Sequence, residues 1–357
     1  MFKKAFPAMA RGAALLATLV AICCAAPAAR CATHGFQATL ENDRFVNRGT
    51  DRWYTNGVRL AWLAQSPCEQ GDALSCKTLD LGDYVLGDPV AKSRGGTRSV
   101  VWTLGQNMYT PRDITRATPQ RGDRPWAGWL YLGATVQGFK GNRFQQSDLK
   151  IGCTGPCSQA DVVQRWIHKG FDATYPAGWS QQLNSRAAVQ ASHMQLWRSG
   201  DSDGKQDSAD RFGFHGGFAL TAGTLRSYAT VMAGAVFGHL EGANPVFALA
   251  NDGDLVIQNF NNTGALARWL LFANVSGTAV ARNQFITGST PYGRSEIELR
   301  RWVSAWQWGV SAPLGGWFEG TNLVFSQTSR SSEFNSPLLS RKEGVQRWGS
   351  ITLSRNW

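Results

Sequence analysis

The sequence has little charge, and it has no long hydrophobic run beyond its first thirty residues. Only 17% of its 357 residues are Asp, Glu, Lys or Arg, whereas about a quarter is usual in globular proteins. No later segment reaches the roughly 18 consecutive apolar residues of a membrane-spanning helix, which excludes a helical membrane protein. Hydrophobic residues still make up 43% of the chain, so a disordered chain is excluded as well.

Glycine, tryptophan and basic residues are abundant instead. The chain has 39 Gly and 15 Trp, and its 36 Lys and Arg against 25 Asp and Glu give a formal charge of +11. The apolar residues are dispersed in short runs, as in proteins built mainly from β-strands. The positive surplus suits anionic molecules, but we do not expect a nucleic-acid partner.

The N-terminal residues have the features of an export signal. Basic residues precede an apolar stretch over residues 13–26, and Ala26-Pro27-Ala28 supplies the small residues of a cleavage site. We therefore expect a signal peptide over residues 1–28 and one domain over residues 29–357.

Export to an oxidising compartment favours disulfides between the remaining cysteines. Cys68 and Cys76 flank a polar loop, and only three residues separate Cys153 from Cys157. Each pair is close enough in sequence to form a disulfide. Zinc is the competing interpretation of the second pair, although no matching Cys or His pair follows at the spacing of a zinc finger.

Alternation of apolar and polar residues, with period two, runs through the rest of the chain. It predicts twelve strands, near residues 34–43, 52–65, 98–109, 125–140, 146–153, 181–198, 209–222, 226–239, 267–282, 295–310, 316–328 and 345–357. Many are longer than the five or six residues usual in soluble sheets. Tilted strands that cross a bilayer need about 9–11 residues.

The even number of long strands predicts a closed antiparallel transmembrane β-barrel, an all-β fold of the bacterial outer membrane. The chain ends on a strand and on the aromatic Trp357, which resembles the sorting signal of such barrels. The alternative is an exported β-sandwich or propeller. No repeat of 40 to 50 residues is visible, which argues against the propeller.

One segment, residues 159–171, has the period of a helix. One of its faces carries Trp166 and Ile167, and another carries Gln164 and His168. If both ends of the barrel chain are periplasmic, the parity of the strands places this loop helix on the extracellular side. The same parity places residues 42–43 at that rim.

Oxygen-bearing side chains are concentrated on the first predicted hairpin. Asn42 and Asp43 end the first strand, and Asp51 and Thr55 lie at the start of the second. Carboxylate, amide and hydroxyl oxygens suit Ca²⁺, which takes 6 to 8 oxygen ligands. The alternative is an Asx-turn in which these polar residues only cap the ends of the strands.

Several short motifs follow one another in a specific order: Glu41–Phe45, Asp51–Gly57, Gly105–Pro111, Asp123–Trp129, and Gly155-Pro156 followed by Gln164 and His168. In this order they resemble the outer-membrane lipid A 3′-O-deacylase family, over nearly the whole chain. The resemblance implies a carboxylic-ester hydrolase with a site between the barrel rim and a loop helix. There, Ca²⁺ polarises an ester carbonyl of lipid A and a histidine activates water.

The resemblance also implies roles for single residues. By position, His168 corresponds to the catalytic histidine of the family, and Gln164 to a glutamine on the loop helix. Asn42 and Asp43 correspond to the pair at the metal, with Asp43 as ligand, and Thr55 to the hydroxyl residue of the second strand. Arg116 corresponds to a basic residue that binds substrate. The acidic residue that follows the histidine in the family has no clear match here, and its candidate positions are Asp172 and Thr174.

Two questions about function remain open at the level of the sequence. One outer loop is rich in arginine, with Arg112, Arg116, Arg121 and Arg124. These arginines either bind the phosphates of lipopolysaccharide or form a solvated rim. The whole barrel could also be non-enzymatic, as a porin or as an adhesion or lipid-binding module among the outer-membrane lipids.

Overall fold

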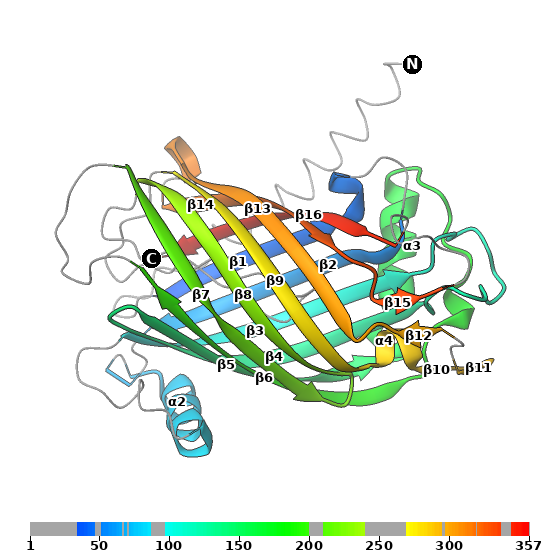
Figure 1. Ribbon diagram of the computed structural model, residues 1–357, viewed down its shortest axis with the longest axis horizontal. Coiled ribbons are helices and arrows are strands. Elements are labelled where there is room, and N and C mark those ends of the chain that lie inside the picture. Colours follow the sequence, from blue (N-terminus) through cyan, green and yellow to red (C-terminus); the bar gives the residue numbers. More distant parts are fainter. Residues whose placement is uncertain are drawn as a thin grey trace.

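Twelve long strands form one closed antiparallel barrel (Figure 1). They are β1 (His34–Asn42), β2 (Trp53–Gln65), β3 (Thr97–Thr110), β4 (Ala127–Lys140), β5 (Arg143–Thr154), β6 (Arg186–Arg198), β7 (Asp210–Gly223), β8 (Arg226–His239), β9 (Leu270–Asn283), β13 (Trp302–Leu314), β14 (Thr321–Arg330) and β16 (Gln346–Asn356). Each strand pairs with the next along the chain, and β1 pairs with β16 to close the barrel. The predicted fold class is therefore confirmed.

The computed structural model describes residues 34–46, 51–65, 68–69, 71–86, 97–199, 210–239, 269–294, 297–318, 320–336 and 344–356. The predicted signal peptide, residues 1–28, and the terminal Trp357 lie outside these residues.

All twelve predicted strands are present, and the largest differences concern where three of them begin. The predicted strand 181–198 begins at Arg186, because a 3-10 helix η4 (Trp179–Gln181) precedes it. The predicted strand 316–328 begins at Thr321, after a 3-10 helix η5 (Gly316–Phe318). The predicted strand 295–310 begins at Trp302, since Glu298–Leu299 form a separate short strand, β12, that pairs with β15 (Phe334–Asn335).

The two faces of the barrel wall differ in polarity. Large apolar side chains stand exposed on the outside, among them Leu132, Phe212, Val231 and Val275. Buried polar side chains line the inside and bond one another across strands, as in the pairs Thr39–Thr352 and Thr230–Thr278. An apolar outer wall with a polar lumen is the arrangement of a barrel that faces lipid.

One end of the barrel carries the loop helix α3 (Ala160–Gly170), the short helix α4 (Gln284–Thr287) and the hairpin β10–β11 (Ser289–Thr290 and Gly293–Arg294) (Figure 1). We call it the outer end. The start of β1 lies beside the end of β16 at the opposite end, where Gly35 pairs with Asn356. This placement agrees with the parity of the strands.

The lumen is filled at the outer end. Side chains from strands on opposite sides of the barrel meet there with Phe285 of α4 in one buried cluster: Tyr54, Tyr109, Ala127, Trp129, Tyr131, Leu183, Ala188, Leu225, Phe285 and Trp348. Arg124 lies over the ring of Tyr109 and pairs with Glu333 at 3.2 Å. We call this cluster, with its Arg124–Glu333 pair, the lumen plug.

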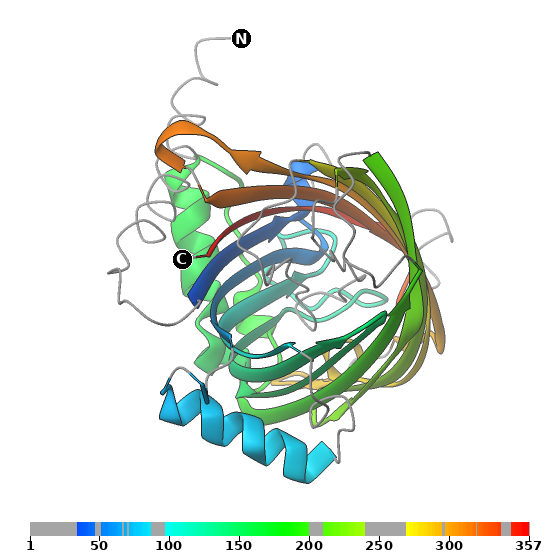
Figure 2. The same ribbon diagram turned by 90° about the vertical axis from the view of Figure 1, so that its left-hand side faces the viewer.

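A second long helix, α2 (Ala73–Leu86), was missed by the sequence analysis, which predicted only a polar loop between Cys68 and Cys76. The helix lies outside the barrel (Figure 2), at the end opposite α3 (Figure 1). Ser75 accepts a hydrogen bond from the indole of Trp102 on β3 at 3.2 Å. The predicted Cys68–Cys76 disulfide is present at the start of the helix. None of the helices in the described residues is both long and apolar enough to cross a membrane.

Candidate functional site

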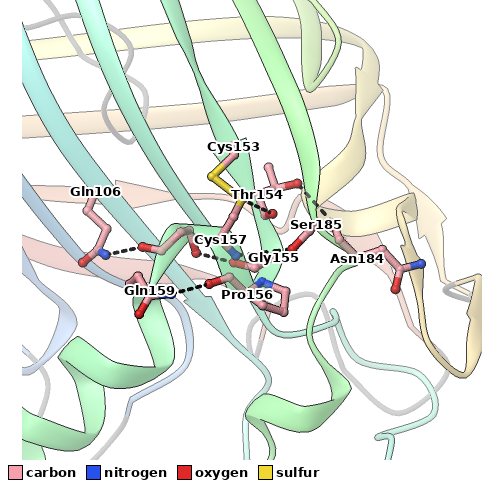
Figure 3. Close-up of a disulfide and its surroundings, with 10 residues drawn as sticks. Gln106, Cys153, Thr154, Gly155, Pro156, Cys157, Gln159, Asn184 and Ser185 are labelled. Carbon is pink, nitrogen blue, oxygen red and sulfur yellow. Dashed lines mark hydrogen bonds between the residues drawn. A yellow bond between two sulfur atoms is a disulfide. The ribbon is translucent and has the colours of Figure 1, made fainter.

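A short cross-linked turn connects β5 to the loop helix α3 (Figure 3). Cys153 near the end of β5 forms the second predicted disulfide, with Cys157 in the 3-10 helix η3 (Gly155–Ser158). Gly155 has a φ of 75°, and a Cβ there would lie 2.3 Å from a neighbouring backbone oxygen. Only glycine fits this position. The cross-link fixes the point at which α3 begins.

The helix lies against the outer wall because β4 has a glycine where the two meet. A Cβ on Gly128 would lie 2.1 Å from Oγ of Ser158 and 2.4 Å from Cβ of Ala160. Gln106 on β3 donates a hydrogen bond to the carbonyl of Ser158 at 2.6 Å (Figure 3). Buried apolar residues complete the contact: Met108, Ile114, Trp126, Ala160 and Trp179, with Val163 packed against them.

The face of α3 that meets the wall carries two polar side chains beside its apolar contacts. Gln164 and His168 are buried, whereas Trp166 is 63% exposed and Val162 also faces outward. The sequence analysis correctly predicted a shared face for Gln164 and His168, and it grouped Trp166 with Ile167, which is half-buried. Gln164 accepts a hydrogen bond from the indole of Trp179 at 2.7 Å, which fixes the buried face of the helix.

His168 is held through one ring nitrogen and faces a carboxylate through the other. Its Nδ1 bonds the carbonyl oxygen of Thr174, just beyond the helix. Because a carbonyl oxygen can only accept, Nδ1 carries a hydrogen and Nε2 is the nitrogen available for proton transfer. Nε2 lies 3.4 Å from Oδ2 of Asp51. Of the two positions considered after the histidine, Thr174 is the one in contact, through its backbone.

Asp51 is the residue that joins the loop helix to the first hairpin. Burial raises the pKa of its carboxyl, and the nearby His168 and Arg44 oppose that rise. The guanidinium of Arg44 lies 3.8 Å from the carboxylate. The sequence analysis grouped Asp51 with the oxygen donors but did not predict its contact with His168.

Asp43 has a buried carboxylate whose two oxygens differ in their hydrogen bonding. It lies in the 3-10 helix η2 (Asp43–Phe45), and its Oδ2 accepts the backbone N–H of Arg52 at 2.8 Å. Its Oδ1 is buried without a hydrogen-bond partner in the described part of the chain. Burial raises the pKa of Asp43 to about 9, and the carboxyl of Asp51 adds to the rise. A cation at Oδ1 would satisfy this oxygen.

Neighbouring oxygens make the donor set suitable for Ca²⁺. Asn42 pairs across the strands with Asn56, and the side-chain oxygen of Asn56 is likewise buried without a partner among the described residues. A carboxylate with amide and backbone oxygens is the chemistry that Ca²⁺ prefers. Asn42 itself caps η2 by accepting the N–H of Arg44 at 2.8 Å, so the turn interpretation of Asn42 also holds. Asn56 was not singled out from the sequence.

Thr55 is buried beneath this hairpin, at an irregularity in the pairing of β2 with β3. Its hydroxyl lies 2.7 Å from that of Thr110, which donates to the backbone carbonyl of Asp51 at 3.2 Å. The structure therefore brings Asp43, His168 and Thr55 together around Asp51. Arg116, in contrast, is exposed on the loop between β3 and β4, and no hydrogen bond or ion pair within the described residues joins it to this group.

The fold and the site define a β-barrel of the outer membrane that carries a buried His–Asp pair on its outer wall, beneath a loop helix. The chain belongs to the family of the outer membrane protein LpxR, whose family model matches residues 14–357. It is an outer-membrane protein of the kind found in Gram-negative bacteria.

The solved structure of an LpxR protein supports the same fold. LpxR from Salmonella typhimurium has a TM-score of 0.65 and 15% sequence identity, with 90% of this chain and 99% of that chain covered. The β domain of the Bordetella autotransporter BrkA has a TM-score of 0.43 and 11% identity, with 92% and 100% covered. No curated protein sequence matches the chain.

Proposed function

We propose that the protein is a calcium-dependent ester hydrolase that removes an acyl chain from lipid A, in the manner of the lipid A 3′-O-deacylases. The observation that carries the proposal is the orientation of His168: Nδ1 is anchored on a backbone carbonyl, and Nε2 faces Asp51 beside the unpartnered oxygen of Asp43. Membership of the LpxR family supports lipid A as the substrate class.

His168 has the position of a general base. In its neutral form, Nε2 accepts the proton of a water molecule that attacks the ester carbonyl, a role that contributes about 10²–10⁴-fold in enzymes. The carboxylate of Asp51, 3.4 Å from Nε2, stabilises the imidazolium that results. The same proton then passes to the alkoxide of the leaving sugar. Gln164, one turn earlier on α3 and held by Trp179, is a positioning residue for this face of the helix.

Asp43, with Asn42 and Asn56 beside it, would hold the calcium ion. When bound, Ca²⁺ supplies positive charge that polarises the ester carbonyl and stabilises the negative oxygen of the transition state. Thr55 supports the same hairpin through Thr110. Arg116, exposed on the β3–β4 loop, would contact a charged part of the substrate.

The position of the site suits a lipid substrate better than a dissolved one. It lies on the outside of the wall, between the strands and α3, where an acyl chain can reach it from the membrane. The lumen plug argues against the alternative of a diffusion pore, because ten buried residues fill the lumen at the outer end. A loop helix that buries a histidine against the outer wall has no role in a pore.

The proposal is tested with purified protein in detergent micelles that contain lipid A, with the released fatty acid measured by mass spectrometry. We expect release in the presence of Ca²⁺, loss of release in EDTA, and recovery when Ca²⁺ but not Mg²⁺ is added back. Absence of release under all of these conditions would contradict the proposal.

A further inference from the structure

Beside the candidate site, the outer end of the barrel has a pocket that the ester-cleaving residues do not use. Its volume is about 370 Å³, within the range usual for small-molecule sites. One wall is residues 119–126 of the β3–β4 loop, and the other is the hairpin β10–β11. Segments about 170 residues apart in the sequence thus form one cavity.

The pocket has two arginines that are available for a ligand. Arg121 comes from the loop and Arg294 from the hairpin, and both are exposed. Neither has an ion pair with a carboxylate among the described residues. Arg124 also lines the pocket, but its guanidinium is already paired with Glu333 and belongs to the lumen plug. Of the four arginines of the loop, Arg112 and Arg116 do not line the cavity.

Asp123 is an acidic residue of the pocket wall, but its carboxylate already accepts hydrogen bonds from groups of the protein itself. Asp123 accepts hydrogen bonds from the indole of Trp53 at 3.0 Å and from the backbone of Arg112 and Arg124 at 2.8 and 2.7 Å. Its carboxylate therefore stabilises the loop, and Arg121 and Arg294 set the charge that a ligand meets. Tyr292, 65% exposed at the tip of the hairpin, adds an aromatic face to the same cavity.

The pocket connects to the candidate site through packed side chains. Trp126 lines the pocket and packs against Trp179 with ring centroids 5.0 Å apart. Trp179 in turn holds Gln164, one turn before His168 on α3. A ligand in the pocket would thus lie next to the tryptophan pair that holds the helix carrying His168.

We propose that this pocket binds the phosphorylated sugar headgroup of the substrate, with a phosphate between Arg121 and Arg294 and a sugar ring against Tyr292. The inference rests on the proposed function, which supplies an ester of a phosphorylated saccharide. Guanidinium groups bind phosphate through paired, charge-assisted hydrogen bonds, and an exposed tyrosine ring offers the apolar face that a sugar ring covers.

Binding is tested without catalysis, by saturation-transfer difference NMR in phosphate-free buffer. The ligands are glucosamine 1-phosphate and, as the uncharged match, glucosamine. We expect binding of the phosphorylated sugar to weaken about tenfold or more in an Arg121→Gln/Arg294→Gln double variant. Arg112→Gln, on the same loop but outside the pocket, is the matched control and should bind as the wild type does. Equal binding in the double variant would overturn the proposal.

Two further measurements separate the headgroup from a plain anion and from the chemistry. If inorganic phosphate competes as well as the sugar phosphate and Tyr292→Ala changes nothing, the saccharide part of the proposal is wrong. With phosphorylated lipid A, the double variant should raise KM about tenfold while kcat is kept. Headgroup binding without any ester release would contradict the proposed function alone, whereas release with an unchanged KM would contradict the pocket alone.

Discussion

At the scale of single residues, the hydrogen bond from His168 to the carbonyl of Thr174 decides which ring nitrogen is available for the proposed proton transfer. His168→Asn keeps a polar side chain but cannot accept the proton, so we expect turnover to fall by about 10²-fold or more. The measurement is fatty-acid release from lipid A in excess calcium.

The matched control for this variant is His193→Asn. His193 is a histidine of strand β6, and its Nδ1 bonds the hydroxyl of Ser147, away from the loop helix. This variant should retain the activity of the wild type. Near-normal rates in His168→Asn would rule out His168 as the base.

Asp43→Asn tests the calcium site through stability instead of activity. Calcium that binds only the folded state stabilises it by about 2.7 kcal/mol at one hundred times its dissociation constant. We expect Ca²⁺ to raise the unfolding temperature of the wild type and not that of Asp43→Asn. Asp161→Asn, in the first turn of α3 and paired with Arg165, is the control and should respond as the wild type does. A full calcium response in Asp43→Asn would place the metal elsewhere.

The buried carboxyl of Asp43 also predicts a pH dependence in EDTA. Its pKa is raised from 3.8 to about 9 by burial, so between these values the folded state keeps a proton that the unfolded state has lost. The folded state then binds more protons, and stability falls as pH rises through this window. Urea unfolding at several pH values should show this loss in the wild type and a flatter profile in Asp43→Asn. An equal slope in both proteins would contradict it.

At the scale of elements, the cross-linked turn before α3 offers a comparison within one chain. Replacing Cys153 and Cys157 by serine frees the start of the helix that carries His168. Since small displacements of a catalytic group cost up to about 10²-fold, we expect activity to fall at least severalfold while the barrel still folds. The Cys68–Cys76 disulfide lies at the opposite end, so serine at both of these positions should leave activity unchanged. A larger loss of activity on replacing Cys68 and Cys76 than on replacing Cys153 and Cys157 would contradict the role of the cross-linked turn.

The strands could be predicted because each needs a lipid-facing and a lumen-facing side, which imposes period two on the sequence. The helix α2 could not be predicted in the same way. It packs a narrow strip, Ser75 and Leu79, against the outer wall and leaves Leu74 and Leu81 exposed. The leucines are thus divided between a buried and an exposed side, so the sequence lacks the single apolar face that marks a helix of a soluble protein.

The candidate site was predictable in its residue types but not in its contacts. Resemblance to a family selected His168 and Asp43, yet nothing in the sequence places Asp51 opposite Nε2, because the two belong to loops more than one hundred residues apart. The hydrogen bond of His168 with the backbone of Thr174 is invisible for another reason: a carbonyl carries no residue signature. The turn interpretation of Asn42 leaves room for the proposed metal at Asp43, since Asn42 caps the turn and Asp43 has an oxygen without a hydrogen-bond partner among the described residues.

At the scale of the whole molecule, the lumen plug predicts an electrically silent barrel. Aromatic rings from opposite strands and the Arg124–Glu333 pair occupy the outer end. We expect no stable ion conductance in planar bilayers at protein densities at which a general porin gives regular steps. Regular channel openings by the wild type would contradict a filled lumen and revive the pore as its function.

Under the proposed function, a site on the outside of the wall, beneath α3, also determines how the protein meets its lipid substrate. A lipid of the outer leaflet reaches such a site by lateral diffusion and never leaves the membrane. Encounter is then two-dimensional, and its frequency depends on the surface density of the lipid and not on its bulk concentration. In mixed micelles, diluting the substrate with inert detergent should slow the reaction even when its molar concentration is held constant.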